Sequence, residues 1–158
     1  MAETNNYNRR NKPQHQPLYD AGGRIQPRDK DLEEAVLGAL MLEKDAYTTV
    51  CDILKPESFY EPANQKIYEA IQQLGAQQRP IDMLTVTEQL RLNDALDEVG
   101  GPVFISELTS KVASGAHVEY HARIVAQKYL ARELISFASQ IESKAFDESN
   151  DVDDLLQE

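Results

Sequence analysis

Residues 117–145 read HVEYHARIVAQKYLARELISFASQIESKA, the longest segment of the chain with a helical pattern. Within it, residues recur at alternating steps of four and three: Tyr120, Ile124, Gln127, Ala131, Leu134, Ala138, Ile141 and Ala145. Residues spaced in this way share one face of an α-helix, and such a helix is roughly 40 Å long at 1.5 Å per residue. The spacing predicts a helix that packs lengthwise against another helix, and we call this face the seam.

A short second helix is predicted after the acidic turn Asp147 to Asp151, where Val152, Leu155 and Leu156 share a face. A helix of about two turns is not stable alone in water, so we expect it to fold back onto the long helix. Residues 114–158 are therefore predicted to form an antiparallel helical hairpin whose second arm is cut short, as in a piece of a larger protein. Six seam residues are expected to pack within the hairpin: Tyr120, Ile124, Ala131, Leu134, Ala138 and Ile141.

The long helix also carries apolar residues outside the seam, at Val118, Val125, Leu130 and Phe137. A hairpin of two helices has little interior, so apolar positions on its flanks stay exposed in a monomer, and an exposed stripe commonly marks an interface. We therefore expect the chain to associate with itself. The residues predicted to contact another chain are Arg123, Val125, Lys128, Arg132 and Phe137.

Residues 27–113 are predicted to form a helical head. The first helix begins after Asp29, a favourable N-cap, and contains Gly38, which weakens a helix by about 1 kcal/mol relative to alanine. We expect close approach of a neighbouring backbone to explain this glycine. Four further helices are expected, over 46–54, from Pro62 to a stop at Gly75, from Asp82 or Thr85 to Leu92, and around 103–108. No segment has a convincing strand pattern, so the predicted fold is all-α.

Residues 1–26 are rich in Asn, Gln, Pro and Gly and lack periodicity, so we expect a disordered leader. Residues 1–30 carry six basic and three acidic residues, a net +3 out of a total of −11, which leaves −14 for residues 31–158. So acidic a body repels a phosphate backbone. A helical nucleic-acid-binding domain is therefore the alternative interpretation, weaker than an association domain.

The sequence offers little catalytic chemistry. Its seven glycines form no G-x-x-x-x-G-K-[ST] loop for phosphates. Acidic residues fall on the polar faces of the predicted helices, and Cys51 is expected to be a small buried apolar residue. His117 and His121, four residues apart, could share a helix face as metal ligands, and a small metalloenzyme is the third interpretation. Glu119 does not directly follow the first histidine, so the zinc-protease pattern is absent. No segment is apolar enough to span a membrane or to be a secretory signal.

Several motifs along the chain resemble one known family. They occur in order along the chain: EEAVLG at 33–38, PESFY at 56–60, NQKIY at 64–68, PIDMLTV at 80–86, VGG at 99–101 and VEYHARIV at 118–125. Together they resemble the N-terminal domain of the bacterial replicative DNA helicase DnaB. The resemblance covers about residues 27–158.

This resemblance implies a helical head followed by a hairpin that pairs between subunits, building homodimers and a homohexameric collar. It implies that this collar docks the C-terminal domain of primase and, in some bacteria, a helicase loader. ATP and Mg²⁺ would bind a separate motor domain, and single-stranded DNA would be reached only through the parent ring. No catalytic, cofactor or metal residue is therefore expected in this chain, and the expected location is the bacterial cytoplasm, at the nucleoid.

Overall fold

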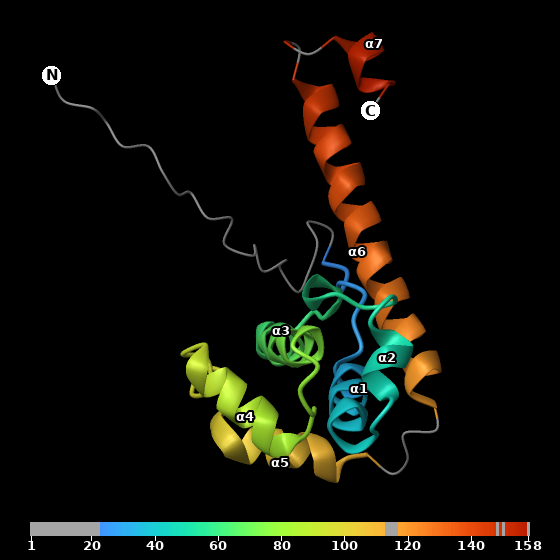
Figure 1. The fold of residues 1–158 in the computed structure, drawn as a ribbon. Helices are drawn as coiled ribbons and strands as arrows, with labels where there is room; N and C mark the ends of the chain where they lie inside the picture. The colour runs from blue at the N-terminus through green and yellow to red at the C-terminus, as the bar shows by residue number, and fades with distance from the viewer. Residues whose placement is uncertain (1–22, 113–116, 148, 150, 158) are drawn as a thin grey trace, which may run out of the picture.

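The computed structural model describes residues 23–112, 117–147, 149 and 151–157. These ranges contain eight helical elements and no strand (Figure 1). In chain order they are α1 (Lys30–Leu42), α2 (Ala46–Val50), the 3-10 helix η1 (Pro56–Ser58), α3 (Pro62–Ala76), α4 (Met83–Leu92), α5 (Gly101–Ser110), α6 (Val118–Phe146) and α7 (Val152–Leu155). The all-α prediction is confirmed.

Helix α1 is the centre of the head, where it packs against α3, α5 and the first half of α6. It starts where predicted, because the side chain of Asp29 accepts a hydrogen bond from the backbone N–H of Leu32 at 3.1 Å. With neighbours on several sides, its apolar residues Val36, Leu37 and Leu40 are almost completely buried.

The contact between α1 and α5 depends on Gly38. A Cβ atom at this position would lie 2.2 Å from the backbone oxygen of Leu108 in α5, closer than any real side chain can approach. The glycine thus permits the close backbone approach that the sequence predicted, and this contact offsets its weak helix propensity.

Helix α4 begins with a reciprocal cap. The Asp82 carboxylate accepts from the backbone N–H groups of Leu84 and Thr85 at 2.9 Å, and the Thr85 hydroxyl accepts from the N–H of Asp82 at 2.9 Å. Of the two predicted starts, Asp82 is the N-cap. Thr85 serves as its partner at the third helical position.

Two predicted helix ends were wrong. Helix α2 stops at Val50 rather than at Leu54, and turns lead on to η1. Helix α3 continues past Gly75 to Ala76, and the left-handed residue after it is Gln78, with φ of 55°. Gly75 has another purpose, because a Cβ atom there would lie 2.2 Å from the ring of Tyr47.

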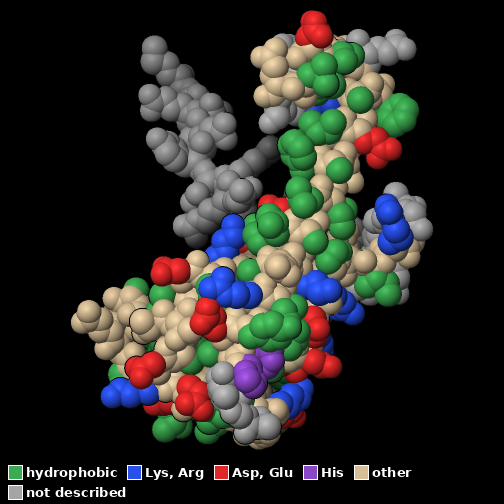
Figure 2. Space-filling view, turned by 90° about the vertical axis from the view of Figure 1, so that its right-hand side faces the viewer, with side chains coloured by type: hydrophobic (Ala, Val, Ile, Leu, Met, Phe, Trp, Pro, Cys, Tyr) green, Lys and Arg blue, Asp and Glu red, His purple; other side chains and the backbone are tan. Residues whose placement is uncertain are grey.

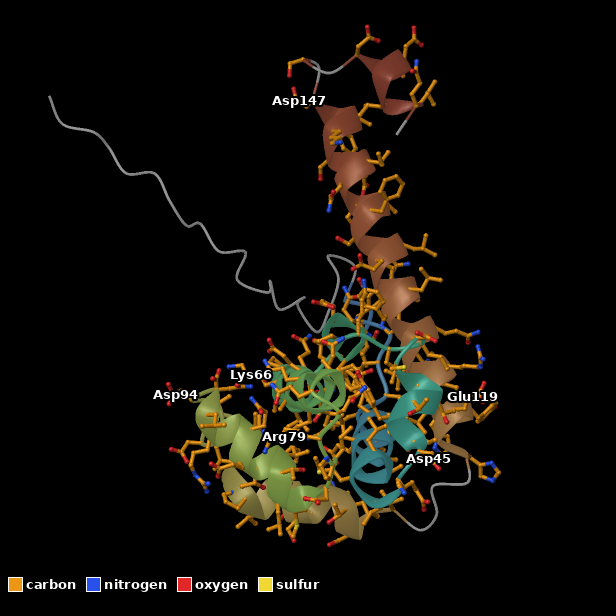
Figure 3. The ribbon with its side chains drawn as sticks, viewed as in Figure 1. Asp45, Lys66, Arg79, Asp94, Glu119 and Asp147 are labelled. Atoms are coloured by element: carbon orange, nitrogen blue, oxygen red, sulfur yellow. The ribbon has the colours of Figure 1, made fainter. Side chains whose placement is uncertain are left out.

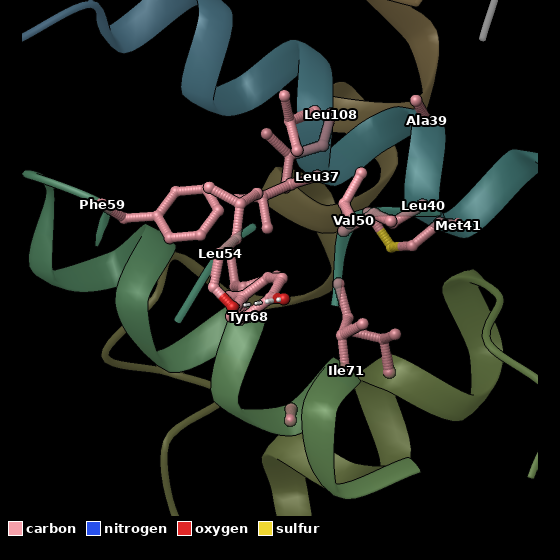
Figure 4. Close-up of a cluster of buried hydrophobic side chains, with 14 of the residues drawn as sticks. Leu37, Ala39, Leu40, Met41, Val50, Leu54, Phe59, Tyr68, Ile71 and Leu108 are labelled. Atoms are coloured by element: carbon pink, nitrogen blue, oxygen red, sulfur yellow. Dashed lines mark hydrogen bonds between the residues drawn. The ribbon is translucent and has the colours of Figure 1, made fainter. Parts of the chain in front are cut away.

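Two adjacent aromatic residues, Phe59 and Tyr60, anchor the loop between η1 and α3 in the core. Figure 4 shows Phe59 there. Phe59 is fully buried, and its ring centroid lies 5.0 Å from that of Tyr68 in α3. The Tyr68 hydroxyl donates to the backbone oxygen of Leu54 at 3.1 Å, so its polar atom has a partner inside the core. Tyr60 is also buried, so both aromatic residues of this loop are anchored.

Helix α6 starts beside the head and then projects well beyond it, with α7 at its far end (Figure 1). We call the projecting part, residues 133–157, the arm. The predicted leader falls mainly on residues 1–22, which lie outside the described residues, as does the predicted head boundary at residue 113. Of the helices that the structure describes, none combines the length and apolarity needed to cross a membrane.

Candidate interaction surface on the projecting helix

The first half of α6 is held by the head through one face. Val118, Ala122, Val125 and Arg132 are its buried residues, and no described residue of α6 beyond Arg132 is buried. The remaining 14 residues of the helix, 133–146, extend about 20 Å at 1.5 Å per residue. This part of α6 therefore meets solvent on most of its circumference.

The arm and the helical turn just before it carry a largely exposed apolar stripe. Leu130 is 60% exposed, Leu134 62% and Phe137 50%, and Ile141 is half-buried. These four residues are spaced by four, three and four positions, so they lie on one side of α6, and we call them the arm stripe. Figure 2 shows hydrophobic side chains following the arm toward its tip. Val152 and Leu156 add exposed apolar surface at α7.

The structure corrects part of the predicted hairpin packing. Tyr120 and Leu134 are more than 60% exposed and Ala138 is also exposed, whereas Ile124, Ala131 and Ile141 are half-buried. The reason is the length of the second arm, because α7 has only four residues and touches α6 near its far end. Among the described residues the seam is therefore mostly uncovered.

Two of the five residues predicted to contact another chain are unavailable for such contact. Val125 is 1% exposed in the head core, and Arg132 is 3% exposed. Both lie on the face of α6 that packs on the head, which periodicity alone did not distinguish from the free flank. Arg123 is exposed and bonded to Glu119 one turn away at 2.7 Å, Lys128 is half-buried, and Phe137 belongs to the arm stripe.

Arg132 is instead the residue that fastens the base of the arm. Its guanidinium donates to the backbone oxygen of Pro27 at 2.7 Å and to that of Ser58 at 2.9 Å. Its Cζ also lies 5.5 Å from the ring centroid of Tyr60 and 5.7 Å from that of Tyr129. One side chain thus joins α6 to the segment before α1 and to the end of η1.

A buried carboxylate accompanies this arginine. Glu33 is 2% exposed and accepts from the backbone N–H of Tyr60 at 2.6 Å and from the Asn64 amide at 3.0 Å. Burial raises the pKa of Glu33, opposed by these hydrogen bonds and by the positive charge of Arg132. The expectation that acidic residues stay on polar faces was therefore wrong for Glu33, and also for the buried Glu34.

The histidine pair shows no metal-binding arrangement. The ring centroids of His117 and His121 are 6.4 Å apart and the rings meet edge-on, while Glu119 is engaged by Arg123. Within the described residues, no group of three or more His, Cys, Asp or Glu side chains could hold a metal ion. Nothing in this geometry supports the metalloenzyme interpretation. Cys51 is only partly buried, so its predicted burial was incomplete.

The fold first defines a class of protein: an all-α domain in which a helical head supports a long projecting helix. A family model described as "DnaB-like helicase N terminal domain" matches residues 25–127 of this sequence. The chain belongs to this family of DnaB-like replicative helicases, and it corresponds to their N-terminal domain. The resemblance inferred from the six sequence motifs is confirmed.

Individual relatives agree with this placement. The chain is 43% identical over 150 residues, 95% of its length, to the replicative DNA helicase DnaB of Rhodothermus marinus. It is 38% identical over 135 residues, 85% of its length, to the replicative DNA helicase DnaC of Bacillus subtilis. The chain covers 16% of the first relative and 30% of the second, so it spans less than a third of either.

Two solved structures resemble the fold. The crystal structure of the N-terminal domain of DnaB helicase from Mycobacterium tuberculosis matches with a TM-score of 0.78 at 34% identity, over 83% of this chain and 92% of that chain. A second structure, described as that of a DnaB-like replicative helicase and its interactions with primase, matches with a TM-score of 0.65 at 28% identity, over 73% of this chain and 27% of that one.

Proposed function

We propose that this chain is a non-catalytic association and docking domain of a replicative DNA helicase, acting in the cytoplasm. In this proposal the arms pair between subunits, first into dimers and then into a hexameric collar. The parent protein unwinds DNA with ATP and Mg²⁺ in a separate motor domain, and single-stranded DNA is contacted only through the parent ring. The observation that carries the proposal is the arm stripe, because an isolated arm gains stability by covering it.

The charge distribution favours this proposal over a nucleic-acid-binding domain. Residues 31–158 carry a net −14, from the total of −11 and the +3 of residues 1–30. Two basic side chains in the first half of α6 are also already engaged, because Arg123 pairs with Glu119 and Arg132 donates to two backbone oxygens. A phosphate backbone would therefore meet repulsion with little compensation.

Sedimentation velocity over a range of concentrations tests subunit association. We expect the unmodified chain to self-associate, and the Leu134→Lys variant to need at least about tenfold higher concentration, since it places a charge in an apolar contact. Leu84→Lys is the matched control, because Leu84 is 75% exposed on α4, away from the arm. A chain that stays monomeric at high concentration, or two variants that behave alike, would remove the basis of the proposal.

Docking is tested separately. We propose that the domain binds the C-terminal domain of primase and, in some bacteria, a helicase loader. The support is the interaction with primase described for the structural relative that matches with a TM-score of 0.65. Calorimetric titration of the chain with a candidate primase C-terminal domain should give saturable binding. A flat titration with primases from several bacteria would argue against this role.

A further inference from the structure

A groove lies on the head between the end of α1, α2, the end of α3 and the start of α4. It encloses about 610 Å³. Its apolar wall comes from Met41, Tyr47, Pro80 and Ile81, and the Tyr47 ring reaches this position because Gly75 leaves room for it. The groove therefore offers an apolar surface of a size suited to a few side chains of another protein segment.

Two cations border this groove, and neither has a charged partner among the residues that the structure describes. Lys44 and Arg79 line it and are exposed, and no carboxylate among the described residues lies within 4 Å of either. Asp82 also lines the groove, but its carboxylate caps α4. Lys44 and Arg79 leave positive charge beside the apolar wall of the groove. They give the groove affinity for an apolar segment that carries carboxylates.

The tip of the arm has this complementary chemistry. Residues 147–158 contain six acidic residues and no lysine or arginine, together with Val152, Leu155 and Leu156. Val152 is 64% exposed and Leu156 is 80% exposed, so these apolar side chains are available for contact. Figure 3 shows Asp147 at the far end of the arm and Arg79 on the head, well apart from each other. A tip that fills the groove must therefore belong to another copy.

We propose that the groove bordered by Lys44 and Arg79 receives the acidic arm tip of a second copy of this chain. The contact rests on the proposed role in subunit association and adds to it a second, different interface. Because groove and tip are distinct surfaces, the contact is heterologous, and it can be repeated from subunit to subunit until a ring closes. Pairing through the arm stripe and docking of the tip would then be separable steps of assembly.

A synthetic peptide of residues 147–158 tests the complementarity directly. Added to the ¹⁵N-labelled full chain, it should shift the NMR signals of Tyr47, Gly75 and Ile81, and should bind more weakly as salt is raised. A peptide with Asn and Gln in place of its acidic residues should bind at least about tenfold more weakly. Shifts confined to the arm stripe, or equal binding of both peptides, would overturn the proposal.

Charge reversal in the full chain keeps this proposal distinct from the previous one. The double variant Lys44→Glu/Arg79→Glu should lose peptide binding by at least about tenfold, whereas Arg91→Glu, an exposed cation on α4, should keep it. All three positions are exposed, so these substitutions should leave the fold unchanged. In sedimentation, the double variant should still pair through the arm stripe but form fewer assemblies larger than a dimer.

The remaining outcomes separate the two proposals. If Leu134→Lys prevents pairing but the double variant assembles like the unmodified chain, the groove inference fails and the association domain stands. If the tip peptide binds in the groove and the chain never pairs through its arm stripe, the association proposal fails alone. Mixing the double variant with an Asp151→Lys/Asp153→Lys variant should restore the larger assemblies, which a purely structural effect of the substitutions would not do.

Discussion

At the base of the arm, one guanidinium connects segments that are far apart in the sequence. Arg132 bonds to Pro27 and Ser58, which are 105 and 74 residues away, and Glu33 binds the start of α3 beside it. A buried charge is costly unless hydrogen bonds and an opposite charge compensate it, and this site provides both. Its effect is to fix the direction in which α6 leaves the head.

The Arg132→Met variant should lower the free energy of unfolding by about 3–5 kcal/mol, because it removes the donor to the Pro27 and Ser58 carbonyls and the positive charge near the buried Glu33 carboxylate. Urea denaturation measures this loss. Arg123→Met is the matched control on the same helix, since it removes only an exposed ion pair worth under about 1 kcal/mol. Equal losses in the two variants would show that Arg132 does not fasten the arm.

The ionisation of Glu33 should contribute to the pH dependence of the free energy of unfolding. Burial raises its pKa above the ordinary value of 4.5, so its stabilising contribution is complete below that value and is lost as pH rises through the raised pKa. The difference in unfolding free energy between the unmodified chain and Glu33→Gln should therefore decrease from acidic toward neutral pH. Urea denaturation at a series of pH values measures it. A difference that stays constant or increases would contradict the assignment.

At the scale of helices, local signals predicted where most elements begin. Asp29, Pro62 and Asp82 each mark a start that the structure shows. The helix end assigned to Gly75 was wrong. Glycine occurs both in left-handed turns and where another group packs closely, and a single sequence does not show which of the two applies. The same limit applied to α6, where periodicity found two apolar faces but not which one the head covers. Arg132 gave no signal, because an arginine at helical spacing resembles any surface cation.

The crossing of α1 and α5 should tolerate no added atom at Gly38. Although alanine is the better helix former by about 1 kcal/mol, Gly38→Ala should destabilise the protein by about 1–3 kcal/mol, because the new methyl group meets the Leu108 backbone. Thermal or urea unfolding would show the change. Gly75→Ala is the comparison, since its obstacle is the half-buried Tyr47 side chain, which can move. A stabilised Gly38→Ala variant would mean that propensity outweighs the contact.

For the whole molecule, the difference in burial between head and arm decides the effect of a substitution on the arm. The head has a continuous core, whereas beyond Arg132 the arm has exposed apolar surface and only a four-residue helix against it. In a closed hairpin, as the sequence predicts, an aspartate at Ile141 would unfold the hairpin or lower its stability by about 2–4 kcal/mol. Because Ile141 is only half-buried here, the substitution should mainly weaken contacts between chains.

Ile141→Asp should therefore weaken self-association by at least about tenfold, while at low protein concentration it should change the free energy of unfolding by less than about 1 kcal/mol. Sedimentation velocity and dilute urea denaturation give the two quantities independently. Ser139→Asp adds the same charge to an exposed position of the arm outside the arm stripe and should change neither. If the free energy of unfolding of the dilute Ile141→Asp monomer falls by several kcal/mol, Ile141 lies inside a closed hairpin. The arm stripe would then stabilise a single chain rather than join two.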